Sequence, residues 1–514
     1  MTSTNLSLIT YLIFIVIGLL SYLVFPKKVK WVSILILSLV CTFILTAYWI
    51  IFLFAAIIVS YFFGKRISYY NERYNNEKIN LDKDERKNLK NKYKHRQKIL
   101  IFVSVVLLLL ILDSLKYFHI PWKYVNNAFE KGFVFSIVLP MLGVSYYMLV
   151  SISYLVDIYR GKYESEKNIF KLALFIGYFP TQIEGPFTRY DELSPMLFKT
   201  ENPTYDDIAD GFYLIILGLF KKIFIADRIN IIVSEVYNRT WLYDGKIVIF
   251  TWLIYAIQLY ADFSGFIDIA RGASKMFGIR LNKNFDKPFA SRSVSEFWRR
   301  WHITLGAWLK DYVFYPIALS KPMMKLSKKL HGRTKEWLEK IIINAIPLFF
   351  VWLCCGIWHG SGLKFIVYGM YFFTIIMLEM LFEPLKKILF KKDNVIIHTF
   401  DIIRTFIFVV IGLSLFRSGS LMYYYKMLKQ LTNNGIFNLI KADVISKYDF
   451  KMMCIGIASI IFIGLYSITF KNKPFKSFNP FIKIALAIIL ILVIIIFGAY
   501  GSSYQAVDPM YALY

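Results

Sequence analysis

Long apolar runs separated by short basic segments recur along the chain, and this pattern predicts a polytopic membrane protein built only from α-helices. A helix needs about 20 apolar residues to cross the hydrocarbon core of a bilayer. The strands of a membrane β-barrel would instead give short segments of alternating polarity. By the length criterion we expect about 11 transmembrane helices. The predicted spans include residues 6–25, 99–118, 133–158, 212–226, 247–259, 341–359, 365–382, 396–415, 452–470 and 482–497.

The first hundred residues contain two segments that need a separate interpretation. Residues 31–63 are apolar throughout and are long enough for one tilted span or for a tight hairpin of two spans, and the sequence leaves this choice open. Residues 64–98 are dense in Lys, Arg and Asn, so we expect a cytoplasmic loop that contains a solvated helix. Because the first apolar run lacks a basic start and is followed by Lys27 and Lys28, we expect a retained helix with its N-terminus outside.

Composition and charge agree with a multi-pass protein of the cell membrane. Hydrophobic residues make up 57% of the chain, the mean hydropathy is +0.52 and the net charge is +27. The basic residues lie in loops beside apolar runs, which is the positive-inside distribution, so the expected partner is the lipid bilayer and not nucleic acid. The four cysteines lie in apolar segments without the spacing of metal ligands, and no metal site is expected.

One histidine lies inside an apolar run, where an ionisable side chain is costly. Residues 341–371 place His359 between Gly356 and Gly360 at the predicted depth of the membrane. Such a side chain is usually functional, because it must face a cavity or a partner. The glycines favour an interrupted helix beside a cavity. The alternative is a histidine that only forms a hydrogen bond to a neighbouring helix.

Two other segments also place polar residues at membrane depth. Residues 172–187 are apolar, short and interrupted by prolines, Glu184 and a glycine, which predicts a re-entrant segment surrounded by protein. The predicted helix 247–259 continues into a polar cluster in which Gln258 and Asp262 share a face and are expected to point toward an interior cavity. For Asp262 the alternative is a carboxylate at a helix end that meets interfacial water.

Residues 293–317 predict an amphipathic helix that is too polar to span the membrane. Ser293 and Glu296 have the spacing of a capping box, which predicts that the helix starts there. Trp298 and His302 share one stripe of this helix, so we expect it to lie against the membrane or in a cavity with His302 facing inward. By itself, His302 is better explained as a hydrogen-bonded residue of an interface than as a catalytic residue, and a second inward-facing histidine strengthens the functional interpretation.

These segments, taken together, resemble the membrane-bound O-acyltransferase family, in particular its bacterial branch of alginate O-acetylation and D-alanyl transfer proteins. The motifs, in the family's order, are LVDIYRG (155–161), GYFPTQIEGPFTRY (177–190), YADFSGFIDIARG (260–272), NFDKPF (284–289), SEFWRRWHITLGAWLKDYVFYP (295–316) and GIWHG (356–360). They divide the chain into N-terminal helices (1–138), a core with a tunnel (139–416) and C-terminal helices with a tyrosine-bearing tail (417–514). The resemblance implies a helical rim around a thin central tunnel that joins the cytoplasm to the outer face.

The resemblance also implies roles for individual residues. It makes His359 the catalytic histidine, expected to act as general base, and His302 the second histidine, expected to orient the acyl donor or polarise its carbonyl. The residues expected to line the tunnel are Asp262, Asn284, Trp298, Gln258, Glu184 and Arg189. For Glu184 and Arg189 the alternative is a structural ion pair beside the re-entrant turn.

The function implied by the resemblance is the transfer of an acyl group, acetyl by preference, from a cytoplasmic thioester toward an extracytoplasmic polysaccharide. The expected donor is a substrate, acetyl-CoA or an acyl carrier protein, and no bound cofactor is expected. The expected partner is a separate esterase-like transferase outside the membrane. One alternative is D-alanyl transfer to teichoic acid from a carrier protein, which could dock on the basic loop 64–98. Another is a proton-coupled transporter or flippase that uses its intramembrane histidines.

The tail suggests one further role. Some members or partners in this branch end in a motif of the form Phe-x-Tyr-x-x-Phe, whose tyrosine is proposed to receive the acyl group. Residues 509–514 match it in part and place Tyr511 at the tyrosine position, with Pro509 and Tyr514 in place of the two phenylalanines. The hypothesis is that Tyr511 is an acyl relay, and the alternative is an unstructured terminus.

Overall fold

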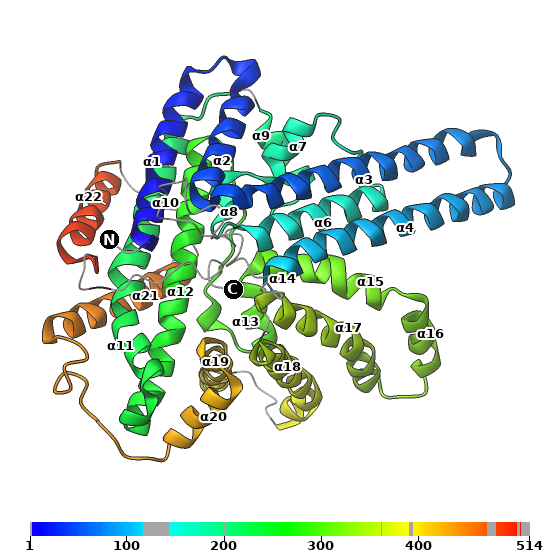
Figure 1. Cartoon of the computed structure of the whole chain (residues 1–514). Coiled ribbons are helices and arrows are strands. Elements are labelled where there is room, and N and C mark those ends of the chain that lie inside the picture. The colour runs from blue at the N-terminus through cyan, green and yellow to red at the C-terminus, as the bar shows by residue number, and fades with distance from the viewer. Residues whose placement is uncertain are drawn as a thin grey trace.

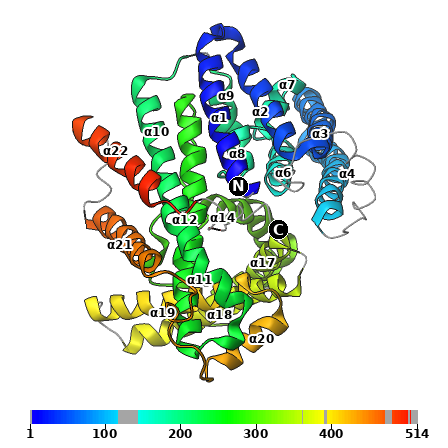
Figure 2. The same cartoon turned by 60° about the vertical axis from the view of Figure 1, so that its left-hand side comes forward.

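The computed structural model describes residues 3–116, 143–199, 201–360, 362–389, 394–469, 480–500 and 504. In these ranges the chain is helical, and eight helices are long and apolar enough to cross a membrane. Two shorter apolar helices, Leu8–Val24 and Ile484–Phe497, add to these. Figure 2 shows the long helices arranged around a central region that contains the short helices α8 and α14. The polytopic helical fold predicted from the apolar pattern is confirmed.

The helices follow the predicted apolar runs and are labelled in Figure 1. The N-terminal part contains α1 (Ser3–Val24), α2 (Lys30–Thr46), α3 (Ile50–Glu77), α4 (Lys83–Lys116) and α6 (Val144–Arg160). The middle part contains α7 (Ile169–Ile176), α8 (Phe179–Gln182), α9 (Tyr190–Leu197), α10 (Tyr205–Leu219), α11 (Asp227–Asn238), α12 (Gly245–Met276), α13 (Val294–Arg300), α14 (Ile303–Leu309), α15 (Tyr315–Ala318) and α16 (Lys321–Leu330). The C-terminal part contains α17 (Glu336–His359), α18 (Leu363–Leu389), α19 (Val395–Arg417), α20 (Leu421–Gln430), α21 (Lys447–Thr469) and α22 (Pro480–Phe497). The predicted span 133–158 begins outside the described residues, and its described part is α6.

The open question about residues 31–63 is answered by two helices. A single turn of 3-10 helix, Ala47–Trp49, separates α2 from α3, and both helices qualify as candidate spans. The polar segment 64–98 connects two candidate spans and is helical over most of its length, because α3 continues to Glu77 and α4 begins at Lys83. Figure 1 shows these two helices projecting together as a long hairpin. The sequence correctly predicted helix there, but not that each polar half is the continuation of an apolar helix.

The short segment 172–187 is buried within the protein, as the re-entrant interpretation predicted. It consists of α7 and α8, and all of its side chains are buried. The side chain of Gln182 supports the break between the two helices, because its Nε2 donates to the carbonyl oxygen of Gly177 at 2.8 Å. The Thr42 hydroxyl on α2 donates to Gln182 Oε1 at 2.6 Å. The backbone groups freed by the interruption are therefore satisfied by protein, as membrane depth requires.

The segment 293–317 is not one continuous helix, contrary to prediction. Ser293 caps α13 by accepting from the N–H of Glu296, but the helix ends at Arg300. His302 then adopts a left-handed backbone conformation with φ 48°, and α14 begins at Ile303. The cause is a segment distant in sequence: the carbonyl oxygen of Asn284 accepts from the N–H of Ile303, and the N–H of Asp286 donates to the carbonyl oxygen of Arg300. The carbonyl of Arg300 and the N–H of Ile303 are therefore not available for the hydrogen bonds of one continuous helix.

Helices α17 and α18 approach each other closely where His359 is placed. A Cβ added to Gly369 would lie 2.3 Å from the carbonyl oxygen of Trp352, and one added to Gly356 would lie 2.5 Å from that of Phe365. Small residues allow two membrane helices to pack backbone to backbone. This contact fixes the end of α17, and therefore the position of His359, against α18.

Candidate functional site

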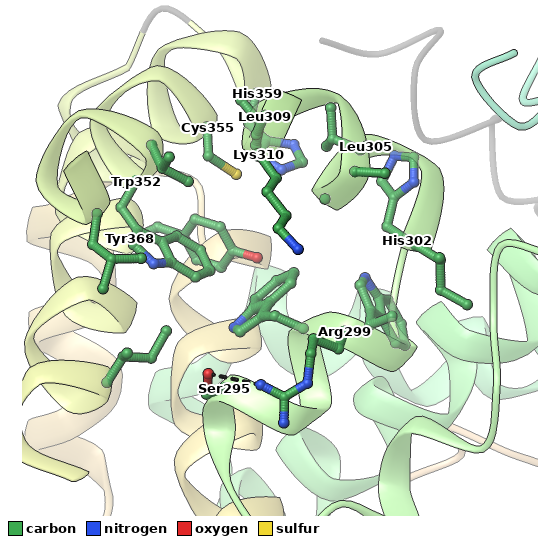
Figure 3. A pocket seen from close by; sticks show the side chains of 18 of the residues that line it. Ser295, Arg299, His302, Leu305, Leu309, Lys310, Trp352, Cys355, His359 and Tyr368 are labelled. Atoms are coloured by element: carbon green, nitrogen blue, oxygen red, sulfur yellow. Dashed lines mark hydrogen bonds between the residues drawn. The ribbon is translucent and has the colours of Figure 1, made fainter. Parts of the chain in front are cut away.

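Both predicted histidines line one cavity of about 580 Å³ between α13, α14, α17 and α18. Its walls are mainly apolar and aromatic, and most of its polar side chains are shown in Figure 3. In that view the rings of His302 and His359 lie at one end of the cavity and Ser295 and Arg299 at the other. The polar and ionisable residues that line it are Ser295, Arg299, His302, Lys310, Cys355, His359 and Tyr368.

His302 is held by Asn284 in a defined tautomer. Asn284 Oδ1 accepts from the N–H of Thr304 at 3.0 Å and from its hydroxyl at 2.9 Å. Because a backbone N–H can only donate, this atom of the amide is the oxygen. The same oxygen lies 3.2 Å from Nδ1 of His302, so Nδ1 is the donor. In the neutral ring the lone pair is therefore on Nε2, which can accept a proton or a hydrogen bond.

His359 is the last residue of α17 and is surrounded by aromatic rings. The rings of Tyr368 and Phe416 present their edges or faces to its imidazole at centroid distances of 5.8 and 5.1 Å, with interplanar angles of 87° and 84°. Trp358 lies on a third side at 4.8 Å. Rings at these distances exclude water from the imidazole on several sides while leaving it in the wall of the cavity. His359 is thus buried and at the same time accessible from the cavity.

Two aromatic rings lie between His302 and a second pocket, which is much smaller, at about 10 Å³. Phe187 stacks on His302 at a centroid distance of 5.8 Å, and Trp358 lies 6.1 Å from both of these rings. On the other side, Phe187 and Trp358 line a small pocket together with Glu184, Tyr146 and others. The two histidines therefore lie beside an aromatic partition, Phe187 and Trp358, with the large cavity on one face and the small pocket with Glu184 on the other.

The remaining predicted lining residues divide into two groups. Trp298 lines the cavity, and Asn284 acts on it through His302. Asp262 and Gln258 contact other helices. Asp262 Oδ1 pairs with Nζ of Lys222, in the segment before α11, at 2.9 Å. Gln258 Nε2 donates to Asn230 Oδ1 on α11 at 3.1 Å. These contacts turn both side chains toward a neighbouring helix, which corrects the expectation that they point into the cavity.

Arg189 and Tyr511 are the last two of the predicted site residues. Arg189 Nη2 pairs with Asp311 Oδ2 at 3.0 Å and lies over the ring of Tyr312, so the ion pair considered between Glu184 and Arg189 is replaced by one with Asp311. Tyr511 lies outside the described residues. No group of three or more His, Cys, Asp or Glu suited to a metal ion occurs in the described part of the chain.

Comparisons with known proteins identify the family of this chain and the reaction class of that family. A family model described as "MBOAT, membrane-bound O-acyltransferase family" matches residues 164–331. The probable alginate O-acetylase AlgI of Pseudomonas syringae pv. tomato is 30% identical over 377 residues, which are 71% of this chain and 67% of that protein. The chain belongs to the membrane-bound O-acyltransferase family. It is therefore an acyltransferase of the membrane, and the alternative of a proton-coupled transporter is set aside.

Two other relatives of this O-acyltransferase modify different molecules, according to their names. The peptidoglycan O-acetyltransferase of Helicobacter pylori is 31% identical over 280 residues, 49% of this chain and 48% of that protein. The teichoic acid D-alanyltransferase of Bacillus subtilis is 28% identical over 284 residues, 54% of this chain and 69% of that protein.

Several residues of the site were missed by sequence reasoning. Thr304 links the two parts of the site, since its hydroxyl accepts from the N–H of Phe187 at 3.0 Å and donates to Asn284. No local pattern indicated this, because the three residues come from distant parts of the chain. Lys222, by contrast, could have been found, because a lysine inside the apolar run 212–226 requires an interior partner.

Removing the Asn284 amide should impair catalysis through His302. In Asn284→Ala the imidazole loses the acceptor that fixes its tautomer, and Thr304 loses two hydrogen bonds. We expect the kcat of the O-acyltransferase to fall by about 10-fold or more with little change in the KM for the donor. Partners that orient metal-ligating histidines typically contribute about 10–100-fold to activity, and Asn284 orients His302 in the same manner. The matched control is Asn282→Ala, whose amide contacts Glu192 at an exposed position. An equal loss in both variants would show that Asn284 has no specific role.

Proposed function

We propose that this O-acyltransferase moves an acetyl group from a cytoplasmic thioester, through the histidine-lined cavity, to a hydroxyl of an extracytoplasmic polysaccharide. The observation that supports this most is the placement of His302 and His359 in one mainly apolar cavity beside the aromatic partition. An acyl thioester can lie in such a cavity with its carbonyl beside the imidazoles. The names of the relatives, which include an alginate O-acetylase and a peptidoglycan O-acetyltransferase, support acetyl and a glycan acceptor.

The orientation of the chain follows from its charge. Basic residues are concentrated in the α3–α4 hairpin and in 321–335, and in a membrane protein such segments lie in the cytoplasm. α14 and α15 lead directly into the second of these segments, and α13 lies just before them in the chain. The end of the cavity at Ser295 and Arg299 therefore faces the cytoplasm, where the thioester is available. The small pocket with Glu184, beyond Phe187 and Trp358, then lies on the side of the acceptor.

The transfer itself needs one base and one leaving group. His359 accepts the proton of the acceptor hydroxyl as its oxygen forms a bond to the acyl carbon, and the bond between that carbon and sulfur then breaks. The proton passes from the imidazolium to the departing thiolate, so the products are an ester and a free thiol. A histidine is suited to this task because its ordinary pKa of about 6.5 allows both steps near neutral pH. Positioned proton transfer of this kind contributes about 10²–10⁴-fold in rate.

His302 acts on the donor in this scheme. Because its Nδ1 donates to Asn284, its Nε2 is available to accept from an amide of the donor or, when protonated, to donate to the thioester carbonyl. A hydrogen-bond donor aimed at the thioester carbonyl stabilises the negative charge that develops on its oxygen in the transition state. The enclosed cavity strengthens that interaction, since electrostatic effects increase where water is excluded.

The proposal includes partners and no bound cofactor. We propose that an esterase-like transferase outside the membrane passes the acetyl group to the final glycan. D-alanyl transfer from a carrier protein is the second candidate, favoured by the Bacillus subtilis relative and by the projecting basic α3–α4 hairpin, which offers a surface for an acidic carrier. Labelled acetate and labelled D-alanine supplied to cells distinguish the two, because only one label should appear on the envelope glycan, and only when the intact chain is present.

Tyr511 is proposed as the residue that receives the acyl group before its release. The chain is anchored shortly before it, because the Tyr504 hydroxyl donates to Asp449 Oδ1 at 3.0 Å and the N–H of Ala499 donates to Ile223. Tyr511 lies seven positions after Tyr504, and an extended chain of seven residues spans at most about 25 Å.

The change Tyr511→Phe should abolish transfer to the external glycan, since only the phenolic oxygen can form an ester, while thiol release from the donor continues at a reduced rate with water as the acyl acceptor. The measurement compares acetyl on the glycan with thiol released from the donor in the same membranes. Tyr500→Phe, at an exposed position of the same terminal segment, is the control. Glycan acetylation at the wild-type rate in Tyr511→Phe would end the relay hypothesis.

A further inference from the structure

We propose that a polar pocket on the outer face, between α11 and the chain that joins α20 to α21, binds a hydroxyl-rich oligosaccharide that carries no negative charge. The pocket has a volume of about 470 Å³. This inference rests on the proposed function, which supplies the glycan acceptor, and it adds the class of glycan that the protein holds. The polar residues that line the pocket are Asn230, Ser234, Glu235, Arg239, Tyr243 and Asp443.

The pocket lies on the outer side of the membrane because three long helices alternate before it. α17 follows the basic segment 321–335, which lies in the cytoplasm. α17, α18 and α19 are each long and apolar enough to cross the membrane, so α17 runs outward, α18 returns and α19 runs outward again. The chain after α19, which contains α20 and the pocket residues 436–444, is therefore outside.

α12 gives the same orientation independently. Its last turns and the segment after it are basic, which places this end in the cytoplasm, and the residues are Arg271, Lys275, Arg280, Lys283 and Lys287. The other end of α12 joins the chain after α20, because the N–H of Asp244 donates to the carbonyl oxygen of Ile436 at 3.2 Å. The N–H of Ile436 in turn donates to that of Leu242 at 2.9 Å. Figure 1 shows α11 and α20 together at this end of the molecule.

The lining of the pocket suits a ligand that is rich in hydroxyl groups. α11 contributes Asn230, Ser234 and Glu235, whose spacing of i, i+4 and i+5 places them on one face of the helix. The volume is in the range of about 300–1,000 Å³ that is typical of small-molecule sites, but such sites are usually mainly apolar. An apolar ligand would leave these polar groups without water or a partner, which is costly. The hydroxyls of a sugar both donate and accept, so they can satisfy amide, hydroxyl and carboxylate groups together.

Hydrogen bonds hold the walls of the pocket in place. The Tyr243 hydroxyl donates to Glu235 Oε1 at 3.1 Å and so ties the start of α12 to α11. Gln430 Nε2 on α20 donates to the carbonyl oxygen of Tyr243 at 2.7 Å. On the remaining side, the N–H of Asp443 donates to the carbonyl oxygen of Ile440 at 3.2 Å. A pocket that is formed before the ligand arrives avoids part of the cost of ordering side chains and loops on binding.

The charge of the pocket determines which glycans fit. Two carboxylates, Glu235 and Asp443, and one guanidinium, Arg239, line it, which leaves one net negative charge. Glu235 and Arg239 pair with each other at 3.3 Å, and Asp443 is exposed. A polyuronate or a polyphosphate would bring like charges to Asp443, which is unfavourable. A neutral sugar has no such cost, and the ammonium group of an amino sugar gains a charge-assisted hydrogen bond.

The pocket also adjoins the anchor of the C-terminal segment. Arg228, two positions before Asn230 on α11, pairs with Asp449 Oδ1. The same carboxylate oxygen accepts from the Tyr504 hydroxyl at 3.0 Å. An oligosaccharide in the pocket would therefore lie close to the point that holds the chain before Tyr511. This position suits an acceptor that takes an acyl group from the proposed relay.

The test is the binding of defined oligosaccharides to the purified full-length protein in detergent, without an acyl donor. The probes are the β-1,4-linked trisaccharides of glucosamine, N-acetylglucosamine and mannuronate, and the measurement is isothermal titration calorimetry. We expect the lowest Kd for the amino trisaccharide, a higher Kd for the neutral one and no saturable binding of the uronate. Binding of the uronate as tight as that of the neutral probe would overturn the proposal, as would no binding of any probe.

Two variants locate the binding in this pocket. Asp443→Asn should raise the Kd of the amino trisaccharide about 10-fold and leave that of the neutral one nearly unchanged, because a charge-assisted hydrogen bond becomes a neutral one. Asparagine tolerates the left-handed backbone conformation of Asp443, φ 54°, so the fold should be kept. Ser234→Ala, which removes a hydroxyl from the α11 wall, should raise the Kd of both probes about 3-fold.

The matched control is Asp206→Asn, which removes an exposed aspartate in the first turn of α10. It should leave the Kd of every probe unchanged. Equal effects of Asp443→Asn and Asp206→Asn would show that only the net charge of the protein matters and would overturn the proposal. Unchanged binding in both Asp443→Asn and Ser234→Ala would place the oligosaccharide elsewhere and would also overturn it.

The experiment separates this inference from the proposed function. A protein that binds the amino and neutral trisaccharides but transfers no acetyl contradicts the proposed function alone. Acetyl transfer to the glycan without oligosaccharide binding contradicts the pocket alone. If Asp443→Asn keeps oligosaccharide binding but releases the external transferase from the complex, the pocket holds a protein, and the glycan proposal is wrong.

Discussion

The substitution His359→Gln should reduce transfer of acetyl to the acceptor by at least about 100-fold, because positioned general-base catalysis contributes about 10²–10⁴-fold. Glutamine retains a similar shape and can form hydrogen bonds, but it cannot take up the hydroxyl proton. The packing of Tyr368 and Phe416 against this position should be largely preserved, so the variant should still fold. The measurement is the rate of label transfer from acetyl thioester to glycan, normalised to the amount of folded protein.

The chain offers a control for this substitution. His331 is an exposed histidine that lies 3.6 Å from Glu339. His331→Gln should leave transfer unchanged, because this imidazole faces solvent. His302→Gln should lower the rate less than His359→Gln does, since His302 acts on the donor and not on the hydroxyl proton. A normal rate in His359→Gln would show that the base is another residue.

The second large effect concerns stability, and it involves Lys222. This lysine follows α10 in a π-helical segment, Phe220–Ala226, and it is buried. Its Nζ lies 2.8 Å from Asp227 and 2.9 Å from Asp262. Lys222→Met would leave two aspartates buried without their cation, and removing one partner of a buried pair typically costs about 3–5 kcal/mol. We expect a large decrease in the midpoint of thermal unfolding of the detergent-purified protein.

Two further variants distinguish lost charge compensation from lost packing. Lys222→Met combined with Asp227→Asn and Asp262→Asn should recover much of the stability, because well-packed neutral groups often replace a buried ion pair without loss. Lys246→Met, on an exposed turn of α12, should have little effect. If the single variant unfolds at the wild-type temperature, or if the triple variant is no more stable than the single one, charge compensation is not the function of Lys222.

The architecture was predictable because it depends on properties that are local in sequence. The lengths of the apolar runs gave most of the long helices, and the interruptions at Pro180 and Gly185 indicated the buried re-entrant segment. His359 was noticed because an ionisable group in an apolar run is costly, and this cost depends only on its neighbours. The structure places it in a cavity with His302.

What could not be predicted depends on contacts between distant segments. The sequence pattern favours one continuous helix through His302, and only the backbone of Asn284 and Asp286 interrupts it. Likewise, the periodicity of α12 places Asp262 on an inward face, but it does not show that this face meets Lys222 instead of a cavity. Helical periodicity gives the direction of a side chain, and the identity of its partner is decided by tertiary packing.

We propose that the acetyl group passes across the membrane by successive covalent transfers through the cavity that contains His359. The most direct test uses sealed vesicles in which all protein molecules face the same way, with a labelled acetyl thioester on the cytoplasmic side and a glycan acceptor together with the esterase-like transferase on the other. We expect labelled ester on the glycan, no intact donor in the acceptor compartment, and loss of both label and thiol release in His359→Gln. Label on the glycan only when donor and acceptor share one compartment would contradict it.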